Sequence, residues 1–154
     1  RAENGWGAAG LEAVAASFRG TGLEVRVRDE LGPHVLTEPA ELLMYRTVQE
    51  GLTNAVRHSR ARSVDILAAA SSDGLLVSVA NDIPAERRQA VPQALVGEEG
   101  GAAPGFGVGG LSERAAELEG TVTAGRVGDS FLLTLSLPHW QAGAPADQGA
   151  SWAR

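Results

Sequence analysis

The sequence predicts an α+β fold, a two-layer sandwich in which a mixed sheet is covered on one face by about three helices. Two observations support this class. Apolar residues recur at helical spacing in three segments, and they alternate with polar residues in five others, as in half-buried strands. The predicted order is helix, strand, helix, two strands, a long loop, helix and two strands, which lets each layer bury one side against the other.

Three segments have the spacing and the boundary residues of helices. The first contains Leu11 to Phe18, and the third runs from about 110 to 119, where Gly120 ends it. The longest is expected over about 40–58, with its cap among Thr37 to Pro39. The apolar stripe expected to face the sheet on this long helix consists of Leu42, Tyr45, Val48, Leu52, Ala55 and Val56.

The predicted strands show period-two alternation. They cover about residues 23–27, 62–70, 75–80, 121–126 and 131–137. Ser72-Asp73-Gly74, between the second and third strands, is a signal for a short hairpin. In the last strand, the side chains expected to share one side are those of Phe131, Leu133, Leu135 and Leu137.

One domain accounts for the folded part of the chain, since 154 residues is a normal length for a single domain. We expect a disordered lead-in at residues 1–7, the domain at 8–138 and a flexible tail at 139–154. Glycines and prolines gather over about 83–109. A loop of that length inside a compact domain is typical of a functional lid.

The composition excludes several classes of function. The 19 acidic and 13 basic residues give a net charge of −6, which disfavours nucleic acid and anionic membranes as partners. The chain has no Lys and no Cys, which rules out P-loop lysines, thiol catalysis and thiolate metal sites. No apolar run approaches the roughly 18 residues of a membrane span. We therefore expect a cytoplasmic domain, without direct membrane contact, that uses carboxylates, amides, Arg, His and backbone.

A polar pair on the long helix is the first candidate site. Glu50 and Asn54 are four residues apart and share a helix face, with His58 one turn beyond. Carboxylate and amide oxygens in this arrangement could hold Mg²⁺, which prefers oxygen ligands. The same spacing also fits a solvated polar face.

A glycine pattern opens the last predicted helix. Gly105, Gly107 and Gly110 form G-x-G-x-x-G, but no strand precedes it as a dinucleotide-binding fold requires. Glycines still let backbone amides approach a phosphate, and a helix start offers unpaired N–H groups. A merely flexible loop would have the same composition.

Asp82 ends an apolar strand and leads directly into the long loop. A carboxylate at a strand end can accept a hydrogen bond from an exocyclic amine, such as that of adenine. Alternatively, Asp82 is a turn or cap residue.

Two of these segments resemble motifs of a known family. The residues from Gln49 to Ser59, QEGLTNAVRHS, closely resemble the N box of sensor histidine kinases. The residues from Gly105 to Arg114, GFGVGGLSER, resemble the second glycine box, in the form of the nitrate-sensor and desaturase-regulator subgroup. The resemblance covers about residues 8–138. It implies the GHKL (Bergerat) ATP-binding fold shared by gyrase, heat-shock chaperone, histidine kinase and mismatch-repair ATPases.

The resemblance also implies sites for ATP and Mg²⁺. Asn54 would ligate the Mg²⁺ that bridges the phosphates, while Glu50 would orient a ligand water or act as base. Arg57 and His58 would lie near the phosphates or ribose, and Asp82 would bind the adenine amino group. The lid and its backbone amides would contact the triphosphate through Gly105, Gly107, Gly110 and Leu111.

The chain departs from the family at the first glycine box, D-x-G-x-G. Asp82 is followed by Ile83-Pro84-Ala85-Glu86, so both glycines are missing. Pro84 fixes φ and has no N–H, which requires a different pocket floor and lid hinge. This difference leaves open a degenerate interaction module with weak or no ATP binding.

No histidine has the sequence context of a phosphoacceptor. His34 lies in a turn, His58 lies in the N box and His139 follows the last strand. We expect the acceptor histidine on upstream dimerisation helices outside this chain, from which the phosphoryl group passes to a response regulator. The alternative is an anti-sigma-type serine kinase, which acts on a partner serine without attached dimerisation helices.

Overall fold

The computed structural model describes residues 8–91 and 107–140 of the chain. The lead-in at 1–7, most of the expected lid (92–106) and the tail from 141 lie outside the described residues. The elements are α1 (Ala8–Arg19), β1 (Glu24–Glu30), α2 (Glu38–Asn54), the π-helix η2 (Ala55–Ser59), β2 (Ser63–Ser71), β3 (Gly74–Asp82), the 3₁₀-helix η3 (Ala85–Ala90), α3 (Val108–Glu117), β4 (Thr121–Val127) and β5 (Ser130–Leu137).

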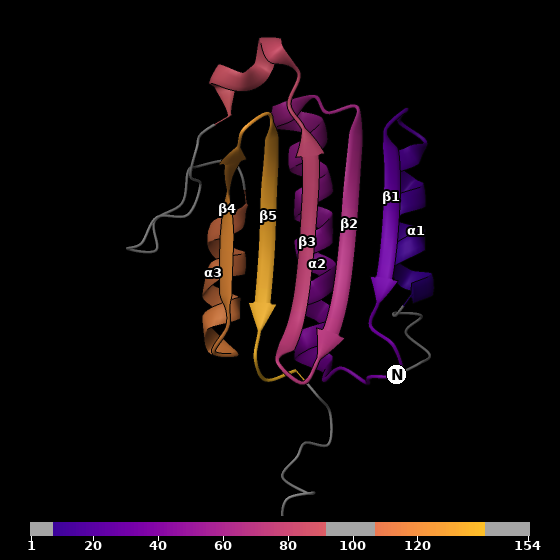
Figure 1. The fold of residues 1–154 in the computed structure, drawn as a ribbon, viewed down its shortest axis with the longest axis vertical. Helices are drawn as coiled ribbons and strands as arrows, with labels where there is room; N and C mark the ends of the chain where they lie inside the picture. Colours follow the sequence, from indigo (N-terminus) through magenta and orange to yellow (C-terminus); the bar gives the residue numbers. More distant parts are fainter. Residues whose placement is uncertain (1–7, 92–106, 141–154) are drawn as a thin grey trace, which may run out of the picture.

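The five strands form one mixed sheet in the order β1-β2-β3-β5-β4. β1 pairs with β2 in parallel, and the other neighbours are antiparallel. The three α-helices lie on one face of this sheet (Figure 1). The predicted α+β sandwich is therefore confirmed, including its helices on a single face.

The core lies between the sheet and the helices. All four residues predicted to share one side of β5 are buried, as are Tyr45, Val48, Leu52 and Ala55 of the predicted stripe. The stripe is wrong at its two ends, because Leu42 is 47% exposed and Val56 is 38% exposed. Leu43 and Met44 are buried instead of Leu42, so the buried face of α2 is rotated from the predicted one. Val56 lies in the π-helix, where the wider turn breaks the 3.6-residue period.

A glycine sets the distance between α2 and the sheet. A Cβ placed on Gly51 would lie 2.7 Å from the Cβ of Val79 on β3. The helix therefore approaches the strand more closely than any side chain at position 51 would allow. This contact fixes which part of α2 lies over which part of β3.

The start of α2 matches the sequence prediction. Thr37 is the N-cap, its hydroxyl oxygen accepts from the N–H of Ala40, and Pro39 lies in the first turn. The hairpin between β2 and β3 is also confirmed, although Ser71 pairs with Gly74, so the two loop residues are Ser72 and Asp73. The predicted strand limits lie within three residues of the observed ones, and two of them coincide.

The packed part of the chain reaches further than predicted at two places. Residues 83–91, expected in the loop, include η3, and both Ile83 and Val91 are buried. Trp140, expected in the tail, is buried, and its carbonyl accepts from the N–H of Thr37 at 2.9 Å. The packed part thus includes residue 140 rather than ending at 138.

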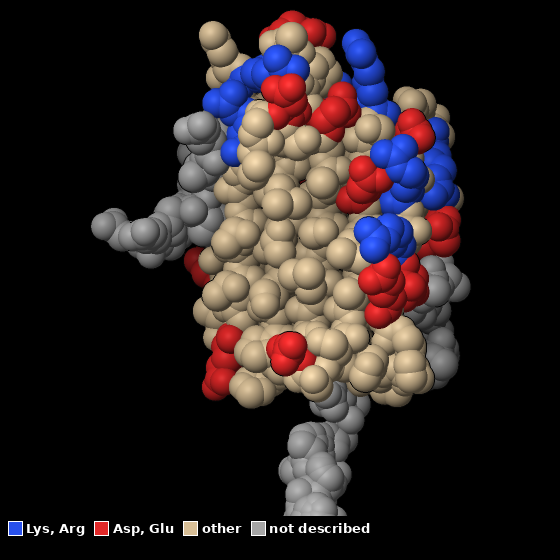
Figure 2. All heavy atoms as spheres, in the orientation of Figure 1, with Lys and Arg blue, Asp and Glu red and all other residues tan. Residues whose placement is uncertain are grey.

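The face of the sheet that the helices leave open is mostly uncharged. Figure 2 shows this face, where tan atoms cover the middle of the sheet and charged side chains gather toward the β1 edge and the two ends. Leu67, Ser78, Thr134 and Thr123 form one row across it in register. Among the described helices, none is long and apolar enough to cross a membrane.

Candidate functional site

The candidate site lies at one end of the molecule, where α2 and β3 end and α3 begins (Figure 1). The register brings Val64, near the start of β2, beside Asn81, near the end of β3. η2 contacts both β3 and η3. Three segments that are distant in the sequence therefore meet at this end.

Glu50 of α2 and Gly107 before α3 are in direct contact. Gly107 has a φ of 73°, in the left-handed region that glycine adopts without strain. A Cβ at this position would overlap both carboxylate oxygens of Glu50. The glycine therefore lets the backbone before α3 lie against the Glu50 carboxylate.

This contact borders a cavity of about 210 Å³ between α2 and α3. Its lining residues are Arg46, Gln49, Glu50, Gly107, Gly110, Leu111 and Arg114. The cavity unites the N-box segment with the second glycine-box segment, which the sequence alone could only propose. Gly105 of the same motif lies outside the described residues.

Charges from the π-helix act on Glu50. Partial burial raises the pKa of the Glu50 carboxyl group above its ordinary value, while the positive charges of Arg57 and His58 oppose that shift. These interactions place both predicted side chains in the electrostatic neighbourhood of Glu50. The carboxylate lies in a setting that disfavours its negative charge and would be compensated by a cation.

The start of α3 provides donors at the cavity wall. Gly107 is its N-cap, no side chain caps the helix there, and its first turn has no acidic residue. The first N–H groups of a helix have no partner within it, and the dipole makes this end positive. Leu111 is buried at the cavity wall.

Gly110 has a different role from the one usually given to a motif glycine. A Cβ built on it would meet nothing within 4 Å, and its φ is not in the left-handed region. Since Gly110 lines the cavity, the missing side chain leaves space there rather than avoiding a clash with protein. This is the arrangement expected where a ligand fills the space.

Asn54 lies at the junction between α2 and the π-helix. Its side chain is buried, so it does not belong to a solvated polar face. π-turns inside helices are rare and are frequent at functional sites. η2 ends at Arg60, which adopts the left-handed conformation, and the guanidinium of Arg87 donates to the carbonyl of His58 at 2.8 and 3.2 Å.

Asn81 was missed by the sequence reasoning and has an unsatisfied buried oxygen. The side chain is 3% exposed, and its Nδ2 donates to the carbonyl of Asp82 at 2.8 Å. Its Oδ1 has no hydrogen-bond partner. A buried acceptor without a partner is costly, and such groups are uncommon unless a ligand or water satisfies them.

The position of Asn81 follows from the Gly51–Val79 contact. Asn81 is two residues beyond Val79, about 7 Å along the strand. Ala55 is four residues beyond Gly51, about 6 Å along the helix. Both elements run toward the same end, so Asn81 lies level with the junction of α2 and η2 and faces the helices.

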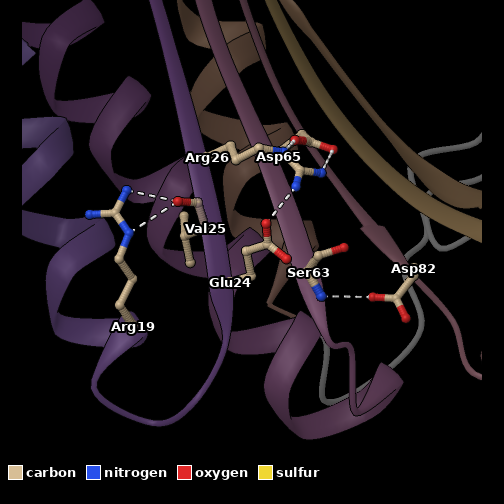
Figure 3. A network of polar contacts seen from close by, with 7 residues as sticks. All are labelled: Arg19, Glu24, Val25, Arg26, Ser63, Asp65 and Asp82. Carbon is tan, nitrogen blue, oxygen red and sulfur yellow. Dashed lines mark hydrogen bonds and ion pairs between the residues drawn. The ribbon is translucent and has the colours of Figure 1, made fainter.

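Asp82 is directed elsewhere, which corrects the sequence expectation. Successive strand side chains point to opposite faces, so Asp82 points away from the helix side that Asn81 occupies. Its Oδ1 accepts from the backbone N–H of Arg62 at 2.8 Å and from that of Ser63 at 2.9 Å. Figure 3 shows the bond from Ser63. Asp82 therefore joins the end of β3 to the start of β2, and the structure does not bring it to the cavity.

The same close-up shows a polar network between the first two strands. Arg26 on β1 binds Asp65 on β2, with Nε–Oδ1 at 2.6 Å and Nη2–Oδ2 at 3.1 Å (Figure 3). Glu24 accepts from Arg26 at 2.8 Å. This network is exposed and holds the β1 edge, so we assign it no part in the site.

The donor set limits how a metal could be held. Within 8–91 and 107–140, no three His, Asp or Glu side chains come together as a metal site. Glu50 and Asn54 could therefore supply part of a Mg²⁺ shell, with phosphate oxygens and waters as the other ligands, as Mg²⁺ commonly requires. The residues present fit Mg²⁺ bound together with a phosphate ligand.

Comparison with known proteins identifies the fold. No family model and no curated protein matches the chain. The blue-light activated histidine kinase of Erythrobacter litoralis EL346 matches with a TM-score of 0.61 and 20% identity, over 84% of this chain and 41% of that one. Full-length ShkA in complex with AMPPNP matches with a TM-score of 0.57 and 23% identity, over 88% of this chain and 30% of that one.

An isolated domain matches over most of its length. The ATP binding domain of PrrB from Mycobacterium tuberculosis gives a TM-score of 0.52 at 19% identity, over 83% of this chain and 90% of that one. The chain thus spans less than half of the two longer kinases. Its five-stranded sheet and three helices have the fold of histidine-kinase ATP-binding domains.

Proposed function

We propose that this chain is the catalytic ATP-binding domain of a sensor histidine kinase of the nitrate-sensor/desaturase-regulator subgroup. The observation that carries the proposal is that the N-box and glycine-box segments line one cavity, with Glu50 against Gly107. The shared fold and the cavity at a helix N-terminus support the same assignment. ShkA, which has this fold, is described in complex with AMPPNP.

Asn81, rather than Asp82, is the proposed acceptor for the adenine amino group. The Oδ1 of Asn81 is buried, unpaired and on the helix side of the sheet, whereas Oδ1 of Asp82 already accepts from two backbone N–H groups. If the first glycine box begins at Asn81, its two glycine positions are Ile83 and Ala85. The glycines are still missing, and the buried Ile83 donates its N–H to the carbonyl of Asp129.

The phosphates of ATP would extend from the Asn54 level of α2 toward the start of α3. The N–H groups after Gly107 would donate to phosphate oxygens, since a helix N-terminus favours anions. Asn54 and Glu50 would hold Mg²⁺, which supplies charge neutralisation at the phosphate oxygens when bound. Arg57 and His58 would lie near the phosphates or ribose, as their effect on Glu50 supports.

The acceptor would be a histidine on dimerisation helices outside this sequence. The unprotonated imidazole nitrogen would attack the γ-phosphorus while the bond from that phosphorus to the β,γ-bridging oxygen breaks. ADP would leave, and the other ring nitrogen would give up its proton to solvent. Such a transfer depends mostly on positioning and charge stabilisation. A response regulator would then take the phosphoryl group, and the site of action would be the cytoplasm.

The histidines inside the chain have other contacts. His34 packs edge-on against Trp140 with ring centroids 5.0 Å apart, and Nε2 of His139 lies 2.9 Å from a carboxylate oxygen of Glu119. Neither is on a helix, which is where the proposed acceptor would lie.

The test is phosphoryl transfer with γ-labelled ATP. The chain is mixed with dimerisation helices of the same full-length kinase, and the label on those helices is followed with and without Asn54→Ala. We expect acid-labile, base-stable label, characteristic of phosphohistidine, that the variant abolishes. Acid-stable phosphoserine on a partner protein would indicate the anti-sigma-type kinase instead. No label and no nucleotide binding would indicate a degenerate module.

A further inference from the structure

Two arginines face the cavity from its two helices. Arg46 lies on α2 and Arg114 lies on α3, and both line the 210 Å³ cavity. Both also line a neighbouring cavity of about 100 Å³ whose other lining residues are Pro39, Leu42, Leu43, Glu117 and Leu118. Both residues therefore border both cavities, at one end of the candidate site.

The larger cavity is suited to an anion. Its charged lining side chains are two arginines and one glutamate, so positive groups outnumber negative ones in its wall. Within the described part of the chain, neither Arg46 nor Arg114 makes a hydrogen bond or an ion pair. By contrast, Arg26 and Arg28 on β1 each pair with a carboxylate. The two cavity arginines thus keep their donors available.

The spacing along the helices gives the direction of a bound polyphosphate. Arg46 is one turn before Glu50 and two turns before Asn54, or about 6 and 12 Å along the axis. Arg114 is one turn after Gly110, on the same side of α3. A ligand whose base lies at Asn81 would pass Asn54 and Glu50 first, and only its far end would reach the two arginines.

We propose that Arg46 and Arg114 clamp the terminal phosphate of a nucleoside triphosphate and thereby select a triphosphate over a diphosphate. This inference rests on the proposed function, because the base must lie at the Asn81 end. Guanidinium groups present forked donors that match phosphate oxygens. During phosphoryl transfer, they would stabilise charge on the equatorial oxygens of the moving group. In a chain without Lys, arginines are the side chains suited to this task.

The test compares three probes by calorimetry on the 154-residue chain: Mg·AMPPNP, Mg·ADP and inorganic tripolyphosphate. The variants are Arg46→Gln and Arg114→Gln, with Arg28→Gln as the matched control, because Arg28 pairs with Glu30 on the sheet edge. We expect each cavity variant to lower the affinity for Mg·AMPPNP about tenfold or more, as expected when a hydrogen bond to a charged group is lost. ADP affinity should change less than about threefold, and Arg28→Gln should change neither affinity.

The outcomes separate this inference from the proposed function. If the cavity variants lose affinity for AMPPNP and ADP equally, or lose affinity for neither, the proposed clamp is overturned, whereas the proposal of nucleotide binding is not. If the unaltered chain binds neither nucleotide, the proposed function fails, and tripolyphosphate then decides about the clamp. If tripolyphosphate binds to the unaltered chain and not to the variant that carries both Arg46→Gln and Arg114→Gln, an anion clamp is supported. If tripolyphosphate does not bind to the unaltered chain, the clamp is overturned. Arg46→Lys, which keeps the charge, should recover part of the AMPPNP affinity but not the full bidentate contact.

Discussion

Replacing Gly110 with Leu should separate the requirements of the fold from those of the ligand. Gly110 is the third residue of α3, its φ is ordinary and a Cβ there meets no protein atom within 4 Å. Leu is favoured over Gly in a helix by up to about 1 kcal/mol. The free energy of unfolding should therefore rise by about 0.5–1 kcal/mol, which for a chain of this size raises Tm by about 1–4 °C.

The same substitution should weaken ligand binding. Gly110 lines the 210 Å³ cavity, so the new side chain would occupy space beside the first N–H groups of α3, which have no partner within the helix. Loss of a single hydrogen bond to a charged phosphate costs about 1.5–3 kcal/mol, so the affinity for Mg·AMPPNP should fall at least about tenfold.

Thermal denaturation and calorimetry give the two readouts. The matched control is Ala116→Leu, at an exposed position of the same helix that lines neither cavity. It should leave the affinity unchanged. A Gly110→Leu protein that binds Mg·AMPPNP as tightly as the unaltered chain would refute the assignment of this cavity to the phosphates. A Tm lowered by several degrees would refute the interpretation that Gly110 leaves empty space.

Three further substitutions test individual side chains. Asn81→Val removes an unpaired buried oxygen together with one hydrogen bond, so Tm should stay equal or rise by a few degrees while the affinity for Mg·AMPPNP falls about tenfold or more. Asn81→Asp keeps an acceptor and should retain the affinity within a few fold. An equal loss of affinity in both variants would contradict the assignment of Asn81 to the purine. Asp82→Ala should lower the free energy of unfolding by about 2 kcal/mol in denaturant titrations, because two backbone N–H groups lose their acceptor. The affinity of the folded variant for Mg·AMPPNP should stay near that of the unaltered chain. Folding raises the pKa of the Glu50 carboxyl group, so its contribution to stability is fully present below the unfolded-state pKa and is lost as pH rises through the folded-state pKa. Glu50→Gln should therefore raise Tm at pH 8, and this gain should shrink toward zero near about pH 4. A change in Tm that does not depend on pH would contradict this reasoning.

The sequence was sufficient for the fold because the periodic patterns agree with the layers that form. The alternation from Phe131 to Leu137 places four apolar side chains on the core side of β5, and Thr37 caps α2 as its residue type suggests. Such local signals depend on neighbouring residues only. The π-helix was not predicted, because the residues after Asn54 continue a helical composition and only the longer hydrogen-bond step distinguishes them.

The site was predicted in part. Glu50, Gly107, Gly110 and Leu111 do border one cavity, as the two motifs suggest. The family motif predicts the acceptor for the base at Asp82, whereas strand parity favours its neighbour, the acceptor proposed above. Leu75, Val77 and Val79 point inward, and Asn81 continues that series where Asp82 cannot.

The two cavity arginines could not be recognised from the sequence. An exposed arginine on a helix is usually part of a solvated surface, and Arg114 differs from that case only in ending the glycine-box segment, which assigns it no contact. Their common position depends on the distance between α2 and α3, which is a property of the tertiary packing. For Arg46, the local signal that points toward the cavity is its i,i+4 relation to Glu50.

The most direct measurement of the central claim is the melting temperature of the unaltered chain with and without Mg·AMPPNP. A ligand that binds the folded state at about one hundred times its Kd stabilises by about 2.7 kcal/mol, which should raise Tm by roughly 5–10 °C. We predict a rise of this size with Mg·AMPPNP and a smaller one when Mg²⁺ is chelated. An unchanged Tm at millimolar Mg·AMPPNP would contradict the claim that these two motifs enclose a nucleotide site.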